Sequence, residues 1–127
     1  MTSWAGLVST ITLVVEDLAV ARRFYTEAFG VPVVFEDPQS AVVRVGGILV
    51  NLLSTTAAAE LLAPAAVGAA GGGPRFVLTV DVADVDAVCA ALAERGVSLL
   101  NGPVDRPWGV RTASFADPDG HVWEIAQ

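Results

Sequence analysis

Few side chains in this sequence could carry chemistry. The 127-residue chain has one histidine, His121, and one cysteine, Cys89, so nucleophiles and soft metal ligands are scarce. His121 and Glu124 are three residues apart in a predicted strand, and this odd spacing places their side chains on opposite faces. Glu124 is therefore the main candidate for a general acid or base, or for a group that holds the NH or OH of a ligand.

A second candidate is an aromatic residue close to a cation. Trp108 and Arg111 follow Pro107, and Gly109 between them permits a tight turn. An aromatic plane beside a guanidinium can hold a flat ligand by stacking and cation–π contact, worth about 0.5–2 kcal/mol. The alternative is that Trp108 packs over the core at a turn and Arg111 is a solvated strand residue. We favour the binding interpretation because the turn leads into a strand of the predicted binding face.

Composition narrows the class of protein. The net charge of −7 argues against a nucleic-acid partner, which needs a basic face. No basic segment precedes the first apolar run, and the uncharged stretch 45–59 is too short to span a bilayer, so we expect a cytoplasmic protein with no membrane partner. With 54% hydrophobic residues in so short a chain, we also expect a homodimer that covers surplus apolar surface.

An internal repeat predicts the architecture. Residues 10–18 and 77–85 are extended apolar runs that end in Val-x-Asp-Leu/Val, and each precedes a helical pattern that stops at Gly-Val. Each half therefore reads as a strand, a helix and three strands, which is an α+β fold. The predicted strands are 7–15, 32–36, 41–45, 48–53, 76–82, 97–100, 110–116 and 121–126; the predicted helices are 18–29 and 85–95, with a short one around 57–62.

The repeat also predicts how the chain is divided. We expect a single domain over 1–127, with module one at about 5–54 and module two at about 75–127. The Ala- and Gly-rich segment at about 55–74 is either a mobile linker between the modules or a lid over a pocket.

The motifs of both halves resemble the vicinal-oxygen-chelate superfamily, which includes glyoxalase I, extradiol dioxygenases, fosfomycin-resistance enzymes and bleomycin-resistance proteins. The resemblance implies two βαβββ modules whose mixed sheets curl into an open cup, with helices on the convex face, and homodimers are common. It rests on Val15-x-Asp17-Leu18, Phe24-Tyr25 and Phe29-Gly30 in the first half, and on Val82-x-Asp84-Val85, Pro107-Trp108-Gly109-x-Arg111 and the run Asp117 to Ile125 in the second.

The resemblance also implies four metal-ligand positions, two in each module. These positions hold Thr10, Asn51, Val77 and Glu124, where most members have histidine or glutamate. Valine has no donor atom, and a hydroxyl or a neutral amide binds transition metals poorly. We therefore expect no metal and no other cofactor.

Alternation along the strands points a mostly apolar set of side chains into the cup, with a few hydroxyls, one amide and two acids. This mixture is typical of a small-molecule pocket. Phe35 could belong to the cup or to the core. The expected ligand contacts are Thr10, Thr12, Phe35, Asn51, Val77, Thr79, Trp108, Arg111 and Glu124.

Two functions fit this pattern best. The first is a metal-free protein of the bleomycin-resistance type, which sequesters a hydrophobic or aromatic compound in the cup and so confers antibiotic resistance. The second is a lyase, isomerase or cyclase that uses Glu124 as acid or base, without metal or with an unusual metal site. We favour the first because sequestration requires no chemistry, and the sequence supplies no second acid–base partner for Glu124. A dimeric scaffold without a pocket is a third alternative.

Overall fold

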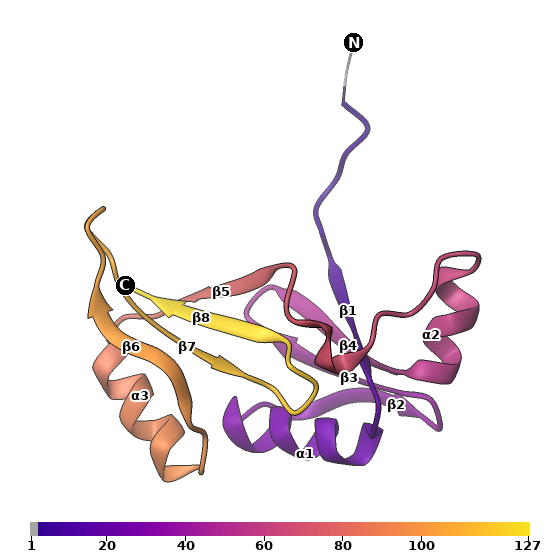
Figure 1. Cartoon of the computed structure of the whole chain (residues 1–127), viewed down its shortest axis with the longest axis horizontal. Helices are drawn as coiled ribbons and strands as arrows, with labels where there is room; N and C mark the ends of the chain where they lie inside the picture. Colours follow the sequence, from indigo (N-terminus) through magenta and orange to yellow (C-terminus); the bar gives the residue numbers. More distant parts are fainter. Residues whose placement is uncertain (1–2) are drawn as a thin grey trace. The chain divides into compact units, whose positions relative to one another are not determined.

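Both halves of the chain fold as a strand, a helix and three further strands, as the repeat predicts (Figure 1). The computed structural model describes residues 3–127 and divides into a first unit that ends at Val67 and a second over Gly68–Gln127. The first unit contains β1 Thr10–Val15, α1 Leu18–Ala28, β2 Val33–Asp37, β3 Ser40–Val45, β4 Ile48–Ser54 and α2 Thr55–Leu62. The second contains a 3-10 turn Ala70–Gly72, β5 Val77–Asp81, α3 Val85–Glu94, β6 Leu99–Asp105, β7 Arg111–Ala116 and β8 Val122–Ala126.

The same capping interactions begin both repeated helices. The Asp17 carboxylate accepts a hydrogen bond from the Val20 backbone N–H at 3.1 Å, and Asp84 does the same for Ala87 at 3.0 Å. These bonds satisfy donors that have no partner inside a helix. The Val-x-Asp motif therefore ends the strand and begins the helix at the same place in each half.

Each unit contains one four-stranded mixed sheet. The strand orders are β1-β4-β3-β2 and β5-β8-β7-β6, and the first and last strands of each unit pair in parallel whereas the other pairs are antiparallel. The predicted α+β class with two βαβββ modules is confirmed. We refer to the first unit's repeat as module one and to the second's as module two.

One face of each sheet is buried beneath a helix. In module one, Leu13 and Val15 of β1 and Tyr25 of α1 are buried. In module two, Trp123 and Ile125 of β8 are buried on the side of α3. The alternating residues Thr12 and Thr79 are exposed, in agreement with the period-two pattern of the sequence. We call the sheet face opposite the helix the open face of that module.

Several elements begin or end elsewhere than the sequence predicts; the strand predicted over 7–15, for example, begins at Thr10. The strand predicted over 97–100 extends to Asp105, because β6 shifts register against β7 after Leu99 and again after Asn101 and so continues to pair. The short helix predicted around 57–62 begins earlier, at Thr55, because the Ser54 hydroxyl accepts the Ala57 N–H and caps it.

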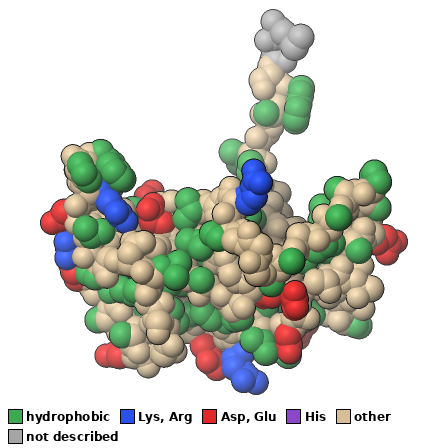
Figure 2. Space-filling view, in the orientation of Figure 1, with side chains coloured by type: hydrophobic (Ala, Val, Ile, Leu, Met, Phe, Trp, Pro, Cys, Tyr) green, Lys and Arg blue, Asp and Glu red, His purple; other side chains and the backbone are tan. Residues whose placement is uncertain are grey.

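Some hydrophobic side chains lie outside both cores. Figure 2 shows them standing out along the N-terminal segment, where Trp4 and Leu7 are almost fully exposed. None of the helices in residues 3–127 has the length and apolar character required to cross a membrane.

Gly102 should be the least replaceable residue of β6. It has φ of 89°, and a Cβ added there would lie 2.5 Å from the Thr112 carbonyl oxygen and 2.7 Å from the Ala113 Cα. We expect Gly102→Ala to lower the free energy of unfolding by about 2–6 kcal/mol, because backbone strain and overpacking each cost about 1–3 kcal/mol. Urea denaturation followed by circular dichroism measures this.

Gly109→Ala is the matched control for this substitution. Gly109 also has a positive φ, of 95°, but nothing lies within 4 Å of its added Cβ. It should therefore show the strain alone, about 1–3 kcal/mol. Equal losses in the two variants would contradict the close approach of β6 to β7.

Candidate functional site

A row of polar side chains crosses the open face of module two. Thr79, Glu124, Ser114 and Asn101 are successive cross-strand partners on β5, β8, β7 and β6, and side chains of paired residues lie on the same face. The Thr79 hydroxyl donates to the Glu124 carboxylate at 3.0 Å. Ser114 is only 8% exposed. The row thus contains one carboxylate held by a neighbouring hydroxyl.

Arg106 closes the β6–β7 end of this row. Its Nε donates to the Thr112 Oγ1 at 2.9 Å, and its Nη2 donates to the Asn101 Oδ1 at 3.0 Å. Thr112 is two residues before Ser114 on β7, so both acceptors belong to the open face. The guanidinium therefore lies over the same face as Glu124.

The other arginine of this region, Arg111, lies on the opposite face. Its Nε and Nη2 donate to the Asp86 carboxylate of α3 at 2.9 and 3.0 Å, and its Nη1 donates to Asp105 at 3.0 Å. The hydrogen bonds that Arg111 donates to Asp86 and, next in size of effect, to Asp105 raise the pKa of its guanidinium. In the same contact, the Arg111 guanidinium lowers the pKa of the Asp86 carboxyl.

The structure gives Trp108 and Arg111 different surroundings. Carboxylates of α3 and β6 hold Arg111 on the helix side of the sheet, so it is not a freely solvated strand residue. Trp108 is 72% exposed in the β6–β7 turn, so it does not pack over the core either. The arginine that faces the open side is Arg106.

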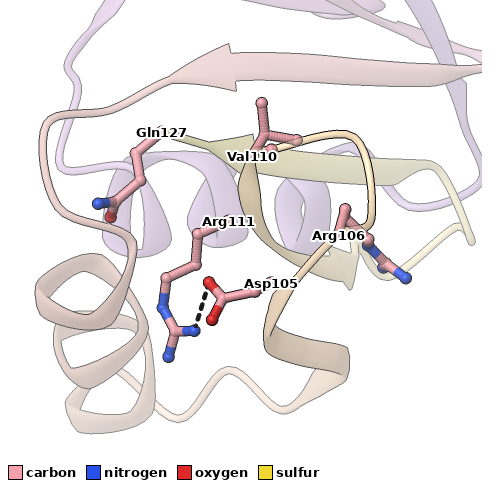
Figure 3. A pocket seen from close by; sticks show the side chains of 6 residues that line it. Asp105, Arg106, Val110, Arg111 and Gln127 are labelled. Carbon is pink, nitrogen blue, oxygen red and sulfur yellow. Dashed lines mark hydrogen bonds and ion pairs between the residues drawn. The ribbon is translucent and has the colours of Figure 1, made fainter.

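An open pocket of about 370 Å³ lies at the same end of the sheet. Figure 3 shows Arg111 and Asp105 pointing toward one another in it, whereas the Arg106 side chain points away from this pair. The turn itself is closed by Arg106, whose backbone N–H donates to the Val110 carbonyl at 2.7 Å and whose carbonyl accepts the Gly109 N–H. The pocket is lined by Asp105, Arg106, Gly109, Val110, Arg111 and Gln127.

Module one carries an equivalent row with different chemistry. Thr12, Asn51, Val42 and Phe35 are successive partners across β1, β4, β3 and β2, and the Asn51 amide donates to the Thr12 hydroxyl at 3.3 Å. This pair occupies the position that Thr79 and Glu124 occupy in module two. Phe35 lies on the open face of module one and is 58% exposed, so it is not part of the core.

The residues at the four implied metal-ligand positions do not fit a metal ion. Val77 has no donor, and the Asn51 amide nitrogen is engaged with Thr12. The Thr10 hydroxyl lies in hydrogen-bond contact with Ser9, which leaves Glu124 as the sole carboxylate of the set. Within the part of the chain that the structure describes, no three His, Cys, Asp or Glu side chains form a metal-binding group.

Cys89 and His121 contribute to the framework. Cys89 is buried in α3, and this burial, with the nearby Asp86 carboxylate, raises the pKa of its thiol. His121 precedes β8 in a turn where its backbone N–H donates to the Asp117 carboxylate at 2.8 Å. Neither residue belongs to the polar row.

Sequence reasoning missed Arg106 as a candidate. Its role depends on the register shifts of β6, which bring Asn101 opposite Ser114 and leave Arg106 beside Thr112. The one feature of the sequence that could have pointed to Arg106 is its position directly before Pro107, at the start of the predicted turn.

Arg111→Gln should change the acid stability of the protein. Because Arg111 lowers the pKa of folded Asp86, the contact stabilises the fold above the ordinary aspartate pKa of 3.8 and loses this effect as pH falls through the lower, folded value. We expect the stability difference between wild type and variant to shrink in that acid range. In the variant, the Asp86 pKa should rise, as measured by NMR titration of the side-chain carboxyl. An unchanged Asp86 titration would contradict the contact.

Comparison with known proteins agrees with this fold. Residues 7–125 match the family model of the Glyoxalase/Bleomycin resistance protein/Dioxygenase superfamily. The Bacillus subtilis protein YraH is 33% identical over 119 residues, which cover 91% of this chain and 93% of YraH.

Solved structures have the same fold as this chain. A glyoxalase/bleomycin resistance protein/dioxygenase from Nocardioides superposes with a TM-score of 0.88 at 24% identity, covering 98% of this chain and 85% of its own. A glyoxalase-related enzyme from Fulvimarina pelagi superposes with a TM-score of 0.82 at 31% identity, covering 96% and 88%. With its repeated modules and its family match over almost the whole length, this chain belongs to the glyoxalase/bleomycin resistance protein/dioxygenase superfamily.

Proposed function

We propose that the protein binds a small hydrophobic or aromatic compound without a metal ion, in the manner of bleomycin-resistance proteins. The observation that carries this proposal is the polar row Thr79–Glu124–Ser114–Asn101 on the open face of module two. The positions on either side of the row on the same strands include Val77, Val122, Ala116, Ala126 and Val104. A few oriented polar groups among apolar side chains are what a small-molecule site requires.

The contacts of Glu124 favour binding over catalysis. Its hydrogen-bond partner is the Thr79 hydroxyl, at 3.0 Å, and the other members of the polar row, Ser114 and Asn101, are neutral. A carboxylate held in this way can accept an OH or NH of a ligand. General acid–base catalysis needs a group to deliver or remove the proton at each step, and the row offers Glu124 alone for this.

The alternative function is a lyase, isomerase or cyclase in which Glu124 is the acid or base. It is supported by the carboxylate itself and by the name of the Fulvimarina pelagi relative, a glyoxalase-related enzyme. Glu124-dependent consumption of a bound compound would favour this alternative over sequestration.

A panel of flat aromatic compounds, including natural products, tests the binding proposal. We expect at least one compound to raise the melting temperature and quench tryptophan fluorescence, with a Kd in the micromolar range or below. Glu124→Gln should weaken binding about tenfold or more, because a hydrogen bond to a charged group contributes about 1.5–3 kcal/mol.

The control for this experiment is Glu94→Gln, which removes an exposed carboxylate at the end of α3. It should bind as the wild type does. If no compound of the panel stabilises or quenches the protein, or if both variants lose affinity equally, the proposed site is wrong.

Metal analysis tests the donor set independently. Protein purified without a His-tag should contain much less than one equivalent of Mn, Fe, Ni or Zn by mass spectrometry, because Thr10, Asn51 and Val77 are poor ligands. Glu124→Gln should not change the residual content. One equivalent of metal in the wild type, lost in this variant, would replace the proposal by a metal-dependent function.

A further inference from the structure

We infer that Arg106 is a specificity-determining residue that recognises an anionic oxygen, such as a carboxylate or phenolate, on the compound bound at the open face of module two. The inference rests on the proposed function and names the chemical class of its ligand. The observation that supports it is the position of the Arg106 guanidinium, which Thr112 and Asn101 hold beside the polar row that contains Glu124.

The Arg106 guanidinium makes its side-chain hydrogen bonds to neutral groups. Both of its side-chain acceptors are neutral, a hydroxyl and an amide oxygen. Among residues 3–127, no carboxylate makes an ion pair with it, whereas Arg111 pairs with both Asp86 and Asp105. In a chain with a net charge of −7, a half-buried cation held by neutral groups is an attractive site for an anion.

The guanidinium is also held in position before any ligand binds. Thr112, which accepts from Nε, is 1% exposed, and the backbone of Arg106 forms both hydrogen bonds of the β6–β7 turn. Of the five guanidinium N–H groups, two donate to Thr112 and Asn101. The remaining donors can form charge-assisted hydrogen bonds to a carboxylate, and little side-chain entropy is lost because the side chain is already ordered.

The neighbouring carboxylates define the rest of the ligand. Glu124 lies one strand beyond Ser114, and Asp81 lies two strands from Thr112 on the same face. Because strands are about 4.8 Å apart, Arg106 and Glu124 are separated by roughly 5–10 Å. An anionic oxygen near Arg106 and an OH or NH near Glu124, joined by one or two aromatic rings, match this spacing. We therefore expect hydroxylated or aminated aromatic acids to bind better than neutral aromatic compounds.

Matched acid and amide pairs test the inference on the wild-type protein. The probes are 4-hydroxybenzoate with 4-hydroxybenzamide, and 6-hydroxy-2-naphthoate with its amide, titrated by calorimetry and by NMR of the backbone amides. We expect the acid of at least one pair to bind about tenfold more tightly than its amide, and its addition to shift the signals of Asn101, Arg106 and Thr112.

Three variants then identify the arginine that is responsible. Arg106→Gln should reduce the acid's affinity to that of the amide, Arg106→Lys should restore part of it, and Arg111→Gln should leave it within about twofold, because Arg111 is already paired. An NMR spectrum with dispersed wild-type signals verifies that each variant is folded.

The outcomes separate this inference from the proposed function. If acids and amides bind the open face equally, or if Arg111→Gln reduces the preference as much as Arg106→Gln does, the inference is overturned while small-molecule binding stands. If neither these probes nor the wider panel bind, both are overturned. A preference for the acid that requires Arg106 supports both.

Discussion

The parallel pairing of the first strand with the last strand of each module is the constraint from which the site follows. In β1 and β4 it places Thr12 beside Asn51, and in β5 and β8 it places Thr79 beside Glu124. A parallel pair needs a crossover connection, and the helix capped by Asp17 or Asp84 begins it. The same helix buries the other side of the sheet. The pairing thus creates both the core and the row of polar side chains.

The two modules share this geometry but differ in chemistry. Module one offers a neutral amide and a hydroxyl, joined to each other, whereas module two offers a carboxylate and a guanidinium held by neutral groups. The same scaffold therefore presents a different set of side chains on the open face of each module. The open face of module one also carries a cation, Arg44 on β3, but the hydrogen-bonded pair beside it is neutral.

Charge compensation distinguishes the two arginines near the β6–β7 turn. They are five residues apart in sequence, and both line the same pocket. Arg111 faces α3 and has two carboxylate partners, so its charge contributes to the attachment of the helix. Arg106 faces the open side and donates to neutral groups. Proximity in sequence therefore says little about which cation is available to a ligand.

The sequence by itself determined the repeat, the helix caps and the alternation of buried and open strand positions. These features are local, since a period of two assigns faces within a strand and an aspartate caps the helix that follows it. The tertiary structure alone decided that Phe35 shares a row with Asn51, that Thr79 holds Glu124, and that Arg106 rather than Arg111 faces the open side. Those facts depend on the register between strands distant in sequence and on the two register shifts of β6. Register is set by backbone hydrogen bonds and side-chain packing across the whole sheet, and no single segment of the sequence specifies it.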